Sequence, residues 1–319
     1  MPSLIKPMLA VPGALPTGPD WSYELKWDGI RAICYAGSEV SLFSRNDRDI
    51  TAGYPEVGPI AAQLPDGGAV LDGELVTFDA AGRPSFGALQ QRMHVTDPAA
   101  VRALAGRVPV VYLIFDLLWL SGHSLLDRPY RDRRELLDQL ELTADGWNTP
   151  PAFDDGADLL AASRARGLEG VVAKRRDSRY EPGRRSAAWR KVKHVRTQEV
   201  VLGGWRPGEG RRAGRIGSVM LGLPDGDRLR YVGQVGTGFS DAMLDELGRT
   251  FEPLSTTSSP FSHSADHGVP PSVARGAHWL QPRLVAEVAF AEWTADRLLR
   301  QPSWRGLRPD KSPDDVVLE

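Results

Sequence analysis

The chain has 319 residues, of which 41% are hydrophobic and 25% charged, and its formal net charge is -2. Such a composition excludes wholesale disorder and a fibrous architecture, and the length favours two domains over one. The longest apolar stretch, residues 108–120, contains Asp116 and is shorter than the roughly 20 residues that span a membrane. Residues 1–16 lack the continuous apolar segment of a secretory signal, and the single Cys34 fits a reducing compartment. We therefore expect a cytoplasmic protein without a membrane partner, with Cys34 buried in a strand.

The first part of the chain alternates strand and helix signals. Between residues 21 and 46, apolar and polar residues alternate on either side of a turn at residues 36–38, which predicts a hairpin with Lys26 near its start. Further strands are expected at residues 69–78, 110–119 and 170–175. Helices are expected after the N-cap Ser85 and at residues 131–140 and 157–166. Because several strands follow one another without an intervening helix, the pattern indicates a mixed α/β domain over residues 1–195.

After His194 the sequence changes to short β segments. Strands are expected at residues 199–205, 217–223, 228–235 and 283–293. A helix capped by Ser240 has apolar positions at helical spacing, namely Met243, Leu244, Leu247, Phe251 and Leu254. Residues 255–271, rich in Ser, Thr and Pro, are expected to form a long mobile loop. Residues 196–319 are thus predicted to form a small β-barrel of the oligonucleotide-binding type (OB-fold), so that the whole chain is α+β.

Positive charge is concentrated in one segment. Residues 164–196 contain twelve Lys or Arg against three acidic residues, Glu169, Asp177 and Glu181. Such a cluster is typical of a phosphate-binding surface, although a charge run alone is more often a solvated face. We therefore expect a nucleic-acid backbone as a candidate partner of this segment.

Lys26 lies in the pattern Lys26-Trp27-Asp28-Gly29, followed by Arg31. A lysine becomes a covalent nucleophile when burial or neighbouring cations favour its neutral amine, and Arg31, Lys191 and Lys193 could supply such a field. Taken alone, the four-residue pattern is equally typical of a solvated lysine before a turn.

Further motifs follow Lys26 in a fixed order. They are Ser44-Arg45-Asn46, Leu71-Asp72-Gly73-Glu74-Leu75, Phe115-Asp116-Leu117-Leu118, Glu169-Gly170-Val171-Val172-Ala173-Lys174, Trp189-Arg190-Lys191-Val192-Lys193 and the ending at Arg305-Gly306-Leu307-Arg308-Pro309-Asp310-Lys311. This ordered set resembles the covalent nucleotidyltransferases, and specifically the ATP-dependent DNA ligases of the bacterial repair type. The resemblance runs from Pro7 to Lys311 and implies a nucleotidyltransferase (adenylation) domain at residues 1–195 and an OB-fold domain at residues 196–319.

The resemblance implies three chemical steps and a role for each motif residue. Lys26 would attack the α-phosphate of ATP to form lysyl-AMP, AMP would pass to the 5′-phosphate of a nick, and the 3′-hydroxyl would then displace it. The implied catalytic residues are Lys26, Asp28, Glu74, Glu169, Lys191 and Lys193. The implied nucleotide contacts are Glu24 on the adenine amino group, Phe115 stacked on the base, Arg31 and Glu74 on the ribose, Arg45 on a phosphate, Lys191 and Lys193 on the α-phosphate, and Arg308 and Lys311 on the departing pyrophosphate.

The resemblance also implies a metal and a macromolecular partner. Magnesium, with manganese as an alternative, would be held by Glu169 and Glu74, because hard cations bound to substrate phosphates need only one or two carboxylates. Nicked double-stranded DNA would be the substrate of a two-domain, monomeric enzyme. Arg206, Arg211, Arg212 and Arg215 and the 255–271 loop would add to the DNA grip through backbone phosphates.

Two other interpretations remain open at this stage. One is a related RNA ligase or a GTP-using RNA-capping enzyme, against which Glu24 and the motif at residues 189–193 favour ATP and DNA. The other is a catalytically inactive nucleic-acid-binding protein, against which the intact motif residues argue. Individually, Phe115 could be a core residue, Glu74 and Glu169 ordinary strand-end carboxylates, and Trp189 a packing residue, while Asp116 within an apolar run requires a partner or a metal.

Overall fold

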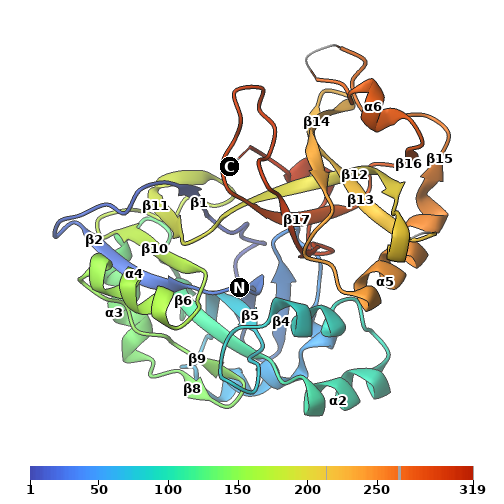
Figure 1. The fold of residues 1–319 in the computed structure, drawn as a ribbon. Coiled ribbons are helices and arrows are strands. Elements are labelled where there is room, and N and C mark those ends of the chain that lie inside the picture. The colour runs from blue at the N-terminus through green and yellow to red at the C-terminus, as the bar shows by residue number, and fades with distance from the viewer. Residues whose placement is uncertain (213, 265–266, 319) are drawn as a thin grey trace. The chain divides into compact units, whose positions relative to one another are not determined.

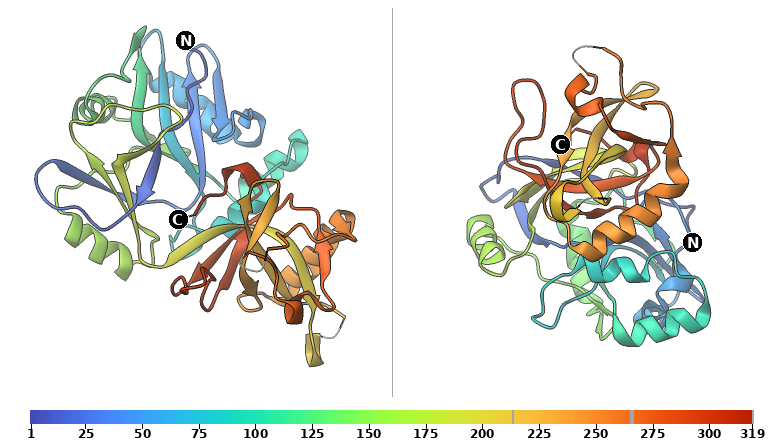
Figure 2. Two further views of the ribbon diagram at one scale, coloured as in Figure 1. Left: turned by 90° about the horizontal axis from the view of Figure 1, so that it is seen from above. Right: turned by 45° about the vertical axis from the view of Figure 1, so that its right-hand side comes forward.

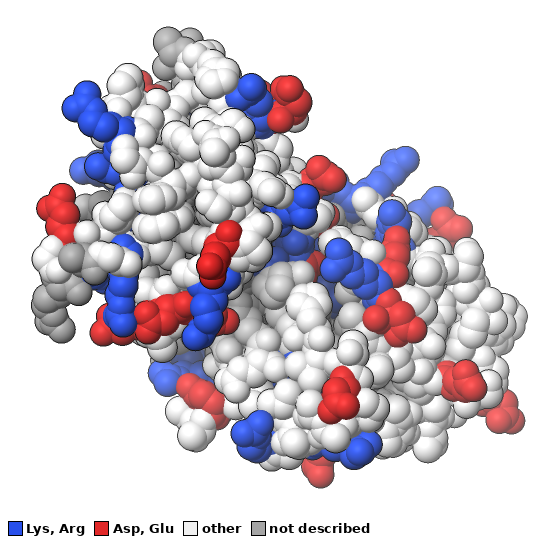
Figure 3. All heavy atoms as spheres, turned by 90° about the vertical axis from the view of Figure 1, so that its right-hand side faces the viewer, with Lys and Arg blue, Asp and Glu red and all other residues white. Residues whose placement is uncertain are grey.

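The structure is a computed structural model that describes residues 1–212, 214–264 and 267–318 (Figure 1). The chain divides into two compact units, unit 1 at Met1–His194 and unit 2 at Val195–Glu319. Lys and Arg side chains are interspersed with Asp and Glu on the face drawn in Figure 3, in line with the net charge of -2. No helix of the described residues is both long enough and apolar enough to cross a membrane.

Unit 1 contains two sheets. The four-stranded sheet has the order β1-β11-β10-β2 and consists of β1 (Leu9–Pro12), β11 (Arg185–Lys193), β10 (Gly170–Arg175) and β2 (Trp21–Lys26). The seven-stranded sheet has the order β4-β3-β5-β6-β9-β8, with β7 paired to β6. Its strands are β3 (Ile30–Ala36), β4 (Val40–Ser44), β5 (Ala69–Val76), β6 (Val111–Leu120), β7 (His123–Ser124), β8 (Thr143–Ala144) and β9 (Trp147–Asn148).

Four α-helices belong to unit 1: α1 (Phe86–Leu89), α2 (Pro98–Arg107), α3 (Tyr130–Gln139) and α4 (Gly156–Ala165). Helix α3 packs on β6, and α4 packs on β10 and β2 (Figure 2). Short 3-10 turns occur at η1 (Thr51–Gly53), η2 (Pro55–Gln63) and η3 (Gln90–Arg92). The expected N-cap is confirmed, since the Ser85 side chain accepts a hydrogen bond from the Ala88 backbone at the start of α1.

Strand β5 lies between β3 and β6 at the centre of the larger sheet and is buried on both faces. Of its eight residues only Glu74 is partly exposed. Burial on both faces requires that any charged side chain in this layer has a partner, because an uncompensated charge in the interior costs several kcal/mol. Cys34 on the neighbouring strand is buried as expected, and burial raises the pKa of its thiol to about 12.

Asp116 on β6 finds its partner on helix α3. The Arg133 guanidinium donates to both Asp116 carboxylate oxygens, at 2.7 and 2.9 Å, and neither side chain is exposed. Arg133 also donates to the backbone oxygens of Arg128 and Ser178. A buried ion pair therefore fastens α3 to the central sheet, and no metal is needed to explain Asp116.

Unit 2 is built around the long strand β12 (Arg196–Pro207). Its first half pairs with β17 (Val285–Phe290), its second half pairs with β16 (His278–Leu280), and its other edge pairs with β13 (Ile216–Asp225). The sheet is completed by β14 (Arg228–Val235), β15 (Ser255–Thr256) and β18 (Ser303–Leu307). At the point where β12 changes partner, a Cβ on Gly203 would lie 2.4 Å from the ring of the buried Phe261, so a larger residue there would have to displace that ring.

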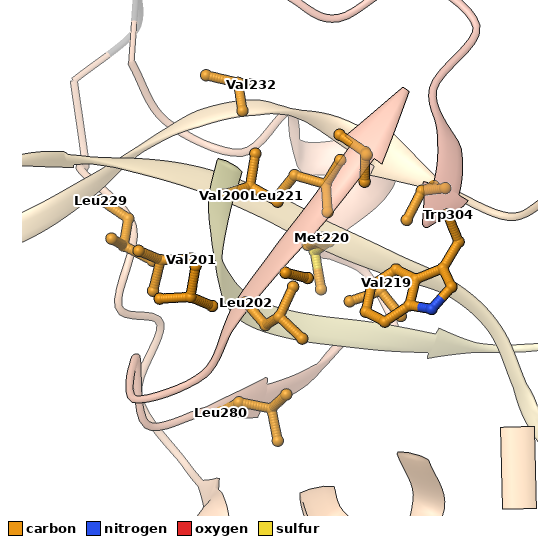
Figure 4. Packing of buried hydrophobic residues seen from close by; sticks show 14 of the residues in the cluster. Val200, Val201, Leu202, Val219, Met220, Leu221, Leu229, Val232, Leu280 and Trp304 are labelled. Atoms are coloured by element: carbon orange, nitrogen blue, oxygen red, sulfur yellow. The ribbon is translucent and has the colours of Figure 1, made fainter. Parts of the chain in front are cut away.

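The core of unit 2 is apolar and draws on most of these strands. Figure 4 shows Val200 and Leu202 from β12, Met220 from β13 and Trp304 from β18 converging on one interior. Helix α5 (Asp241–Phe251) adds Leu244, Leu247 and Phe251, and Ser240 is its N-cap as expected. The remaining helical segments are α6 (Pro271–Ala274), η4 (Gly210–Arg212), η5 (Glu252–Leu254) and η6 (Pro313–Asp315).

Several expectations need correction. Met243 is 40% exposed, because the apolar stripe of α5 turns Leu244 and not its neighbour toward the core. The 255–271 segment is not simply a mobile loop: it contains β15 and the fully buried Phe261, although residues 265–266 lie outside the described part. Helix α2 and strands β1, β16 and β18 were not expected, because each is short or lacks a clear apolar period.

Asp116→Ala is expected to destabilise the protein by about 3–5 kcal/mol, because it leaves the buried Arg133 charge without a partner. Urea unfolding at neutral pH measures this loss. The matched control is Asp177→Ala, which removes the exposed partner of Arg175 and should cost less than about 1 kcal/mol. Equal losses in the two variants would contradict a special role for the buried pair.

Candidate active site

One face of the four-stranded sheet carries most of the predicted chemistry. In the antiparallel register Lys26 on β2 lies opposite Gly170 on β10, which in turn lies opposite Lys193 on β11. Two residues along each strand, Glu24 lies opposite Val172, and Val172 opposite Lys191. Because alternate residues of a strand point to the same side, the side chains of Lys26 and Glu24 on β2 project from the same sheet face as those of Lys193 and Lys191 on β11.

Glu169 joins the two lysines of the first row. Its carboxylate accepts a hydrogen bond from Lys26 Nζ at 2.6 Å and forms an ion pair with Lys193 Nζ at 2.9 Å. Burial by itself would raise the pKa of Glu169, but the charges of Lys26 and Lys193 and their hydrogen bonds outweigh burial and lower it from 4.5 to about 2. The three side chains are 14–22% exposed, so the cluster remains accessible.

Two glycines make this arrangement sterically feasible. Gly170 lies between Lys26 and Lys193, has a φ of +151°, and a Cβ there would lie 2.0 Å from the Val192 carbonyl oxygen. Gly29 follows Asp28 in the turn from β2 to β3, where a Cβ would lie 2.2 Å from the Leu75 carbonyl oxygen. The turn at Gly29, which follows Lys26 and Asp28, therefore packs directly against β5 next to Glu74.

Arg31 is held by a residue for which sequence reasoning assigned no role. In the β3–β5 register it lies opposite Glu74, yet its guanidinium donates to both oxygens of Asp72, at 2.5 and 2.6 Å. Tyr180 donates to the same carboxylate at 2.6 Å. The Arg31 guanidinium also lies 4.6 Å from the centre of the Phe115 ring, which fixes the cation beside the expected base-stacking residue.

Phe115 is half-buried at the centre of β6. Its ring packs edge to face against Trp189, 6.3 Å away, and Trp189 is buried. Packing is therefore the role of Trp189, while Phe115 keeps a partly accessible surface. Lys174, at the end of the same motif as Glu169, donates to the Phe115 carbonyl oxygen at 2.9 Å.

Glu24 is buried and has two partners that sequence reasoning missed. Its Oε1 accepts a hydrogen bond from the Tyr130 hydroxyl at 2.5 Å and forms an ion pair with Lys174 Nζ at 2.8 Å. Lys174 could have been singled out as a cation in a quoted motif, whereas no sequence signal marks Tyr130 at the start of α3. The structure therefore assigns a set of supporting residues behind the predicted nucleotide contact.

The remaining predicted residues of unit 1 are more peripheral to these contacts. Arg45 is half-buried directly after β4, and Asp28 is half-buried in the β2–β3 turn. Lys191 is half-buried on β11 and lies opposite Pro12 of β1 as well as Val172.

In unit 2, the two predicted cations after β18 are bound to carboxylates. Arg308 donates to both oxygens of Asp310, at 2.9 and 2.7 Å, and lies 3.5 Å from Glu199 and 3.6 Å from Glu287. Lys311 forms an ion pair with Glu199. Burial by itself would lower the pKa of Arg308, but Asp310, Glu199 and Glu287 raise it well above its ordinary value.

Comparisons with known proteins show the family of the chain. The family model described as "ATP dependent DNA ligase domain" matches residues 2–193, and that described as "ATP dependent DNA ligase C terminal region" matches residues 212–311. The end-joining DNA repair protein LigD of Mycobacterium tuberculosis is 46% identical over 99% of this chain, which spans 40% of that protein's length. DNA ligase C of the same species is 34% identical over 98% of this chain and 90% of its own length.

A solved structure is also similar to this chain over almost its whole length. The mycobacterial DNA ligase D complexed with ATP and MES matches with a TM-score of 0.68 at 44% identity, covering 99% of this chain and 98% of its own. The expected fold class, a nucleotidyltransferase domain followed by an OB-fold domain, is thereby confirmed.

The Glu169 ion pairs predict a pH-dependent contribution to stability. Since the folded-state pKa of about 2 lies below the ordinary 4.5, this stability is present above pH 4.5 and is lost as the pH falls toward 2. Glu169→Gln should therefore destabilise the protein at pH 7, and the gap to wild type should narrow by about 2 kcal/mol by roughly pH 3.

Urea unfolding of both proteins across this pH range is the measurement. Glu39→Gln, at an exposed position, serves as the control and should show no gap that changes with pH. A constant gap in Glu169→Gln would mean that the carboxylate is not held by the two lysines.

Proposed function

Because the chain belongs to the ATP-dependent DNA ligase family, we propose that it uses ATP to join a 5′-phosphate to the adjacent 3′-hydroxyl at a nick in duplex DNA. The observation that carries this proposal is the Lys26–Glu169–Lys193 cluster on an accessible sheet face. The relative whose solved structure is described as complexed with ATP supports ATP as the nucleotide. The name of the LigD relative refers to end-joining repair, which supports DNA breaks as the setting.

In the first step, Lys26 Nζ releases its proton to solvent and attacks the α-phosphate, so that the P–N bond of lysyl-AMP forms as the P–O bond to pyrophosphate breaks. Covalent catalysis of this kind divides one difficult condensation into activated steps. Glu169 Oε2, 2.6 Å from Lys26 Nζ, orients the amine. With a pKa of about 2 the carboxylate is a weak base, so we assign it to orientation and not to removal of the proton.

The other cations of the sheet face offset the charge that develops on the α-phosphate. Lys193 shares the Glu169 carboxylate, and Lys191 projects from the same face two residues away. Fixed cations in a partly buried site stabilise a phosphoryl transition state more than they would in water. The same two lysines are suited to hold the phosphate in the later steps, when AMP passes to the 5′-phosphate and the 3′-hydroxyl displaces it.

The nucleoside half of ATP would lie over β3, β5 and β6. Phe115 offers a partly accessible ring for stacking, and Arg31, fixed by Asp72, keeps its Nη1 clear of that carboxylate for a ribose hydroxyl. Glu74 is partly exposed opposite Arg31, and Glu24 would accept from the adenine amino group. Arg45 would bind a phosphate of the nick.

Magnesium is assigned to Glu169, with Glu74 as a second ligand. The described residues contain no group of three or more His, Cys, Asp or Glu side chains that could hold a metal by themselves. One or two carboxylates suffice for an ion that takes its remaining ligands from phosphates and water, so the donor types fit magnesium. Because both Glu169 oxygens contact ammonium groups, the ion would take the place of one of these contacts. The bound ion would neutralise charge on the phosphates, a role that manganese could share.

Fewer positive charges in residues 164–196 are available to bind DNA than the count of Lys and Arg in the sequence implied. Of the cations in residues 164–196, Lys174 and Lys193 are paired with Glu24 and Glu169, and Arg175 is paired with Asp177. The exposed cations outside these three pairs are Arg164, Arg166, Arg179, Arg184, Arg185 and Arg196. We propose that these exposed side chains, and Arg206, Arg212 and Arg215 of unit 2, bind DNA backbone phosphates.

Lys26→Ala is expected to abolish formation of the covalent protein–AMP adduct, because it removes the attacking nitrogen, and Lys193, the other cation on Glu169, is assigned to the α-phosphate. Incubation with radiolabelled ATP followed by denaturing electrophoresis measures the adduct. Lys6→Ala, at a lysine with a 66% exposed side chain, is the control and should label like wild type. A labelled adduct in Lys26→Ala would disprove the assignment of the nucleophile.

Arg308→Ala combined with Lys311→Ala should block adduct formation while a nick supplied already adenylated is still sealed, because these cations are assigned to the departing pyrophosphate. The two activities are measured side by side. Arg300→Ala, at an exposed arginine, is the control and should keep both. Equal losses of both activities in the double variant would show that the two cations serve the fold of unit 2.

A further inference from the structure

Lys174 is a buried cation to which the proposed chemistry gives no role. Its side chain is 2% exposed, and its ammonium lies 4.4 Å from the Trp189 ring, 4.5 Å from the Phe115 ring and 5.0 Å from the Tyr130 ring. An ammonium group loses its hydration on burial, and ring faces and hydrogen bonds only partly replace it. Burial lowers the pKa of Lys174, and the charges of Glu24 and Asp116 oppose that shift without cancelling it. The cost of keeping this charge inside a candidate nucleotide site indicates that Lys174 has a function there.

The contacts of Lys174 connect two residues that would recognise the base. Its ammonium forms an ion pair with Glu24 Oε1 at 2.8 Å and donates to the Phe115 carbonyl oxygen at 2.9 Å. The Tyr130 hydroxyl donates to the same Glu24 oxygen. Since both partners use Oε1, the other oxygen, Oε2, takes part in neither contact.

Building on the proposed function, we propose that Lys174, assisted by Tyr130, is a specificity-determining positioning residue that holds Glu24 ionised and oriented, so that adenine is accepted and guanine rejected. An ionised carboxylate accepts hydrogen bonds and cannot donate them. Oε2 would accept from the amino group of adenine, whereas the guanine oxygen at the same ring position would be repelled. A protonated carboxyl could donate to that oxygen, and the distinction between the two bases would be lost.

The surroundings of Glu24 make Lys174 the partner that matters for this charge. Tyr130 on α3 contributes a neutral hydroxyl. Arg134 on α3 interacts with the Glu24 charge but gives its hydrogen bonds to Asp138 and to the Pro150 carbonyl oxygen, so Lys174 is the cation in direct contact with Glu24. Lys191 shares the sheet face with Glu24 but lies two strands away. Without the Lys174 ammonium, Glu24 Oε1 keeps the Tyr130 hydroxyl but loses the cation that contacts it directly.

The test compares formation of lysyl-AMP and lysyl-GMP, measured as kcat/KM with radiolabelled ATP and GTP. Lys174→Met, of similar length and without charge, should lower the preference for ATP over GTP by about tenfold or more, since a charge-assisted hydrogen bond loses its discrimination. Lys191→Met is the matched control: it should slow labelling with both nucleotides and leave their ratio unchanged.

A further arm separates a specificity role from a purely structural one. Glu24→Gln should also lower the preference, and the Glu24→Gln/Lys174→Met double variant should lower it no further, because Lys174 acts through Glu24.

The outcomes are distinguishable. Wild type that forms no lysyl-nucleotide overturns the proposed function itself. If wild type is labelled, two results would overturn the role of Lys174 and leave the proposed function standing. One is an unchanged ATP-to-GTP ratio in Lys174→Met, and the other is additive losses in the double variant. Thermal melting checks that the variant is folded. If Lys174→Met does not fold, Lys174→Gln takes its place, since it also removes the charge beside Glu24 and must lower the ratio.

Discussion

The candidate site depends on one carboxylate shared between two ammonium groups. Lys26 and Lys193 lie on strands that are not neighbours, and Gly170 of the intervening strand lets the β11 backbone approach closely, since a Cβ there would lie 2.0 Å from the Val192 carbonyl oxygen. Without the Glu169 carboxylate the two cations would repel each other across a partly buried face. Because Glu169 directly precedes β10, the register of the four-stranded sheet fixes the position of the proposed nucleophile. The chemistry of the site is therefore a consequence of strand pairing, and a shift of one residue would send these side chains to the opposite face.

Unit 1 also contains ion pairs between a carboxylate and a cation that are buried more deeply than the Glu169 cluster. Asp72 holds Arg31, Asp116 holds Arg133 and Glu24 holds Lys174, each with at least one partner that is almost fully buried. Such pairs contribute little net stability, since desolvation offsets most of the attraction, but each is costly to break. Their geometry is consequently better suited to fixing the direction of functional groups than to strengthening the fold. Arg31 and Glu24, the two residues proposed to contact the nucleoside, are both oriented in this way.

Much of this arrangement could be read from the sequence, and the exceptions have physical reasons. The hairpins at residues 30–44 and 216–235, the capped helices α1 and α5 and the ordered motifs all depend on local patterns, which sequence carries directly. Tyr130 reaches Glu24 across 106 positions of the chain and Asp72 reaches Tyr180 across 108, and no local pattern records such contacts. Phe261 was assigned to a loop because Ser and Pro surround it, yet Gly203 and Gly222 leave a space in the opposite strands that its ring fills.

The two sets of cations proposed to meet ATP differ in how far they are already neutralised. On the sheet face of unit 1, two ammonium groups share the Glu169 carboxylate, so these three groups together carry a net positive charge that attracts an anionic nucleotide. In unit 2, Arg308 and Lys311 face three carboxylates, Glu199, Glu287 and Asp310, and a phosphate must displace at least one of them. A cation that exchanges one anion for another gains little ground-state affinity but can act where charge increases during the reaction. The unit 1 cluster is thus suited to capture the nucleotide, and the unit 2 cations to contribute mainly when the charge on the leaving pyrophosphate grows.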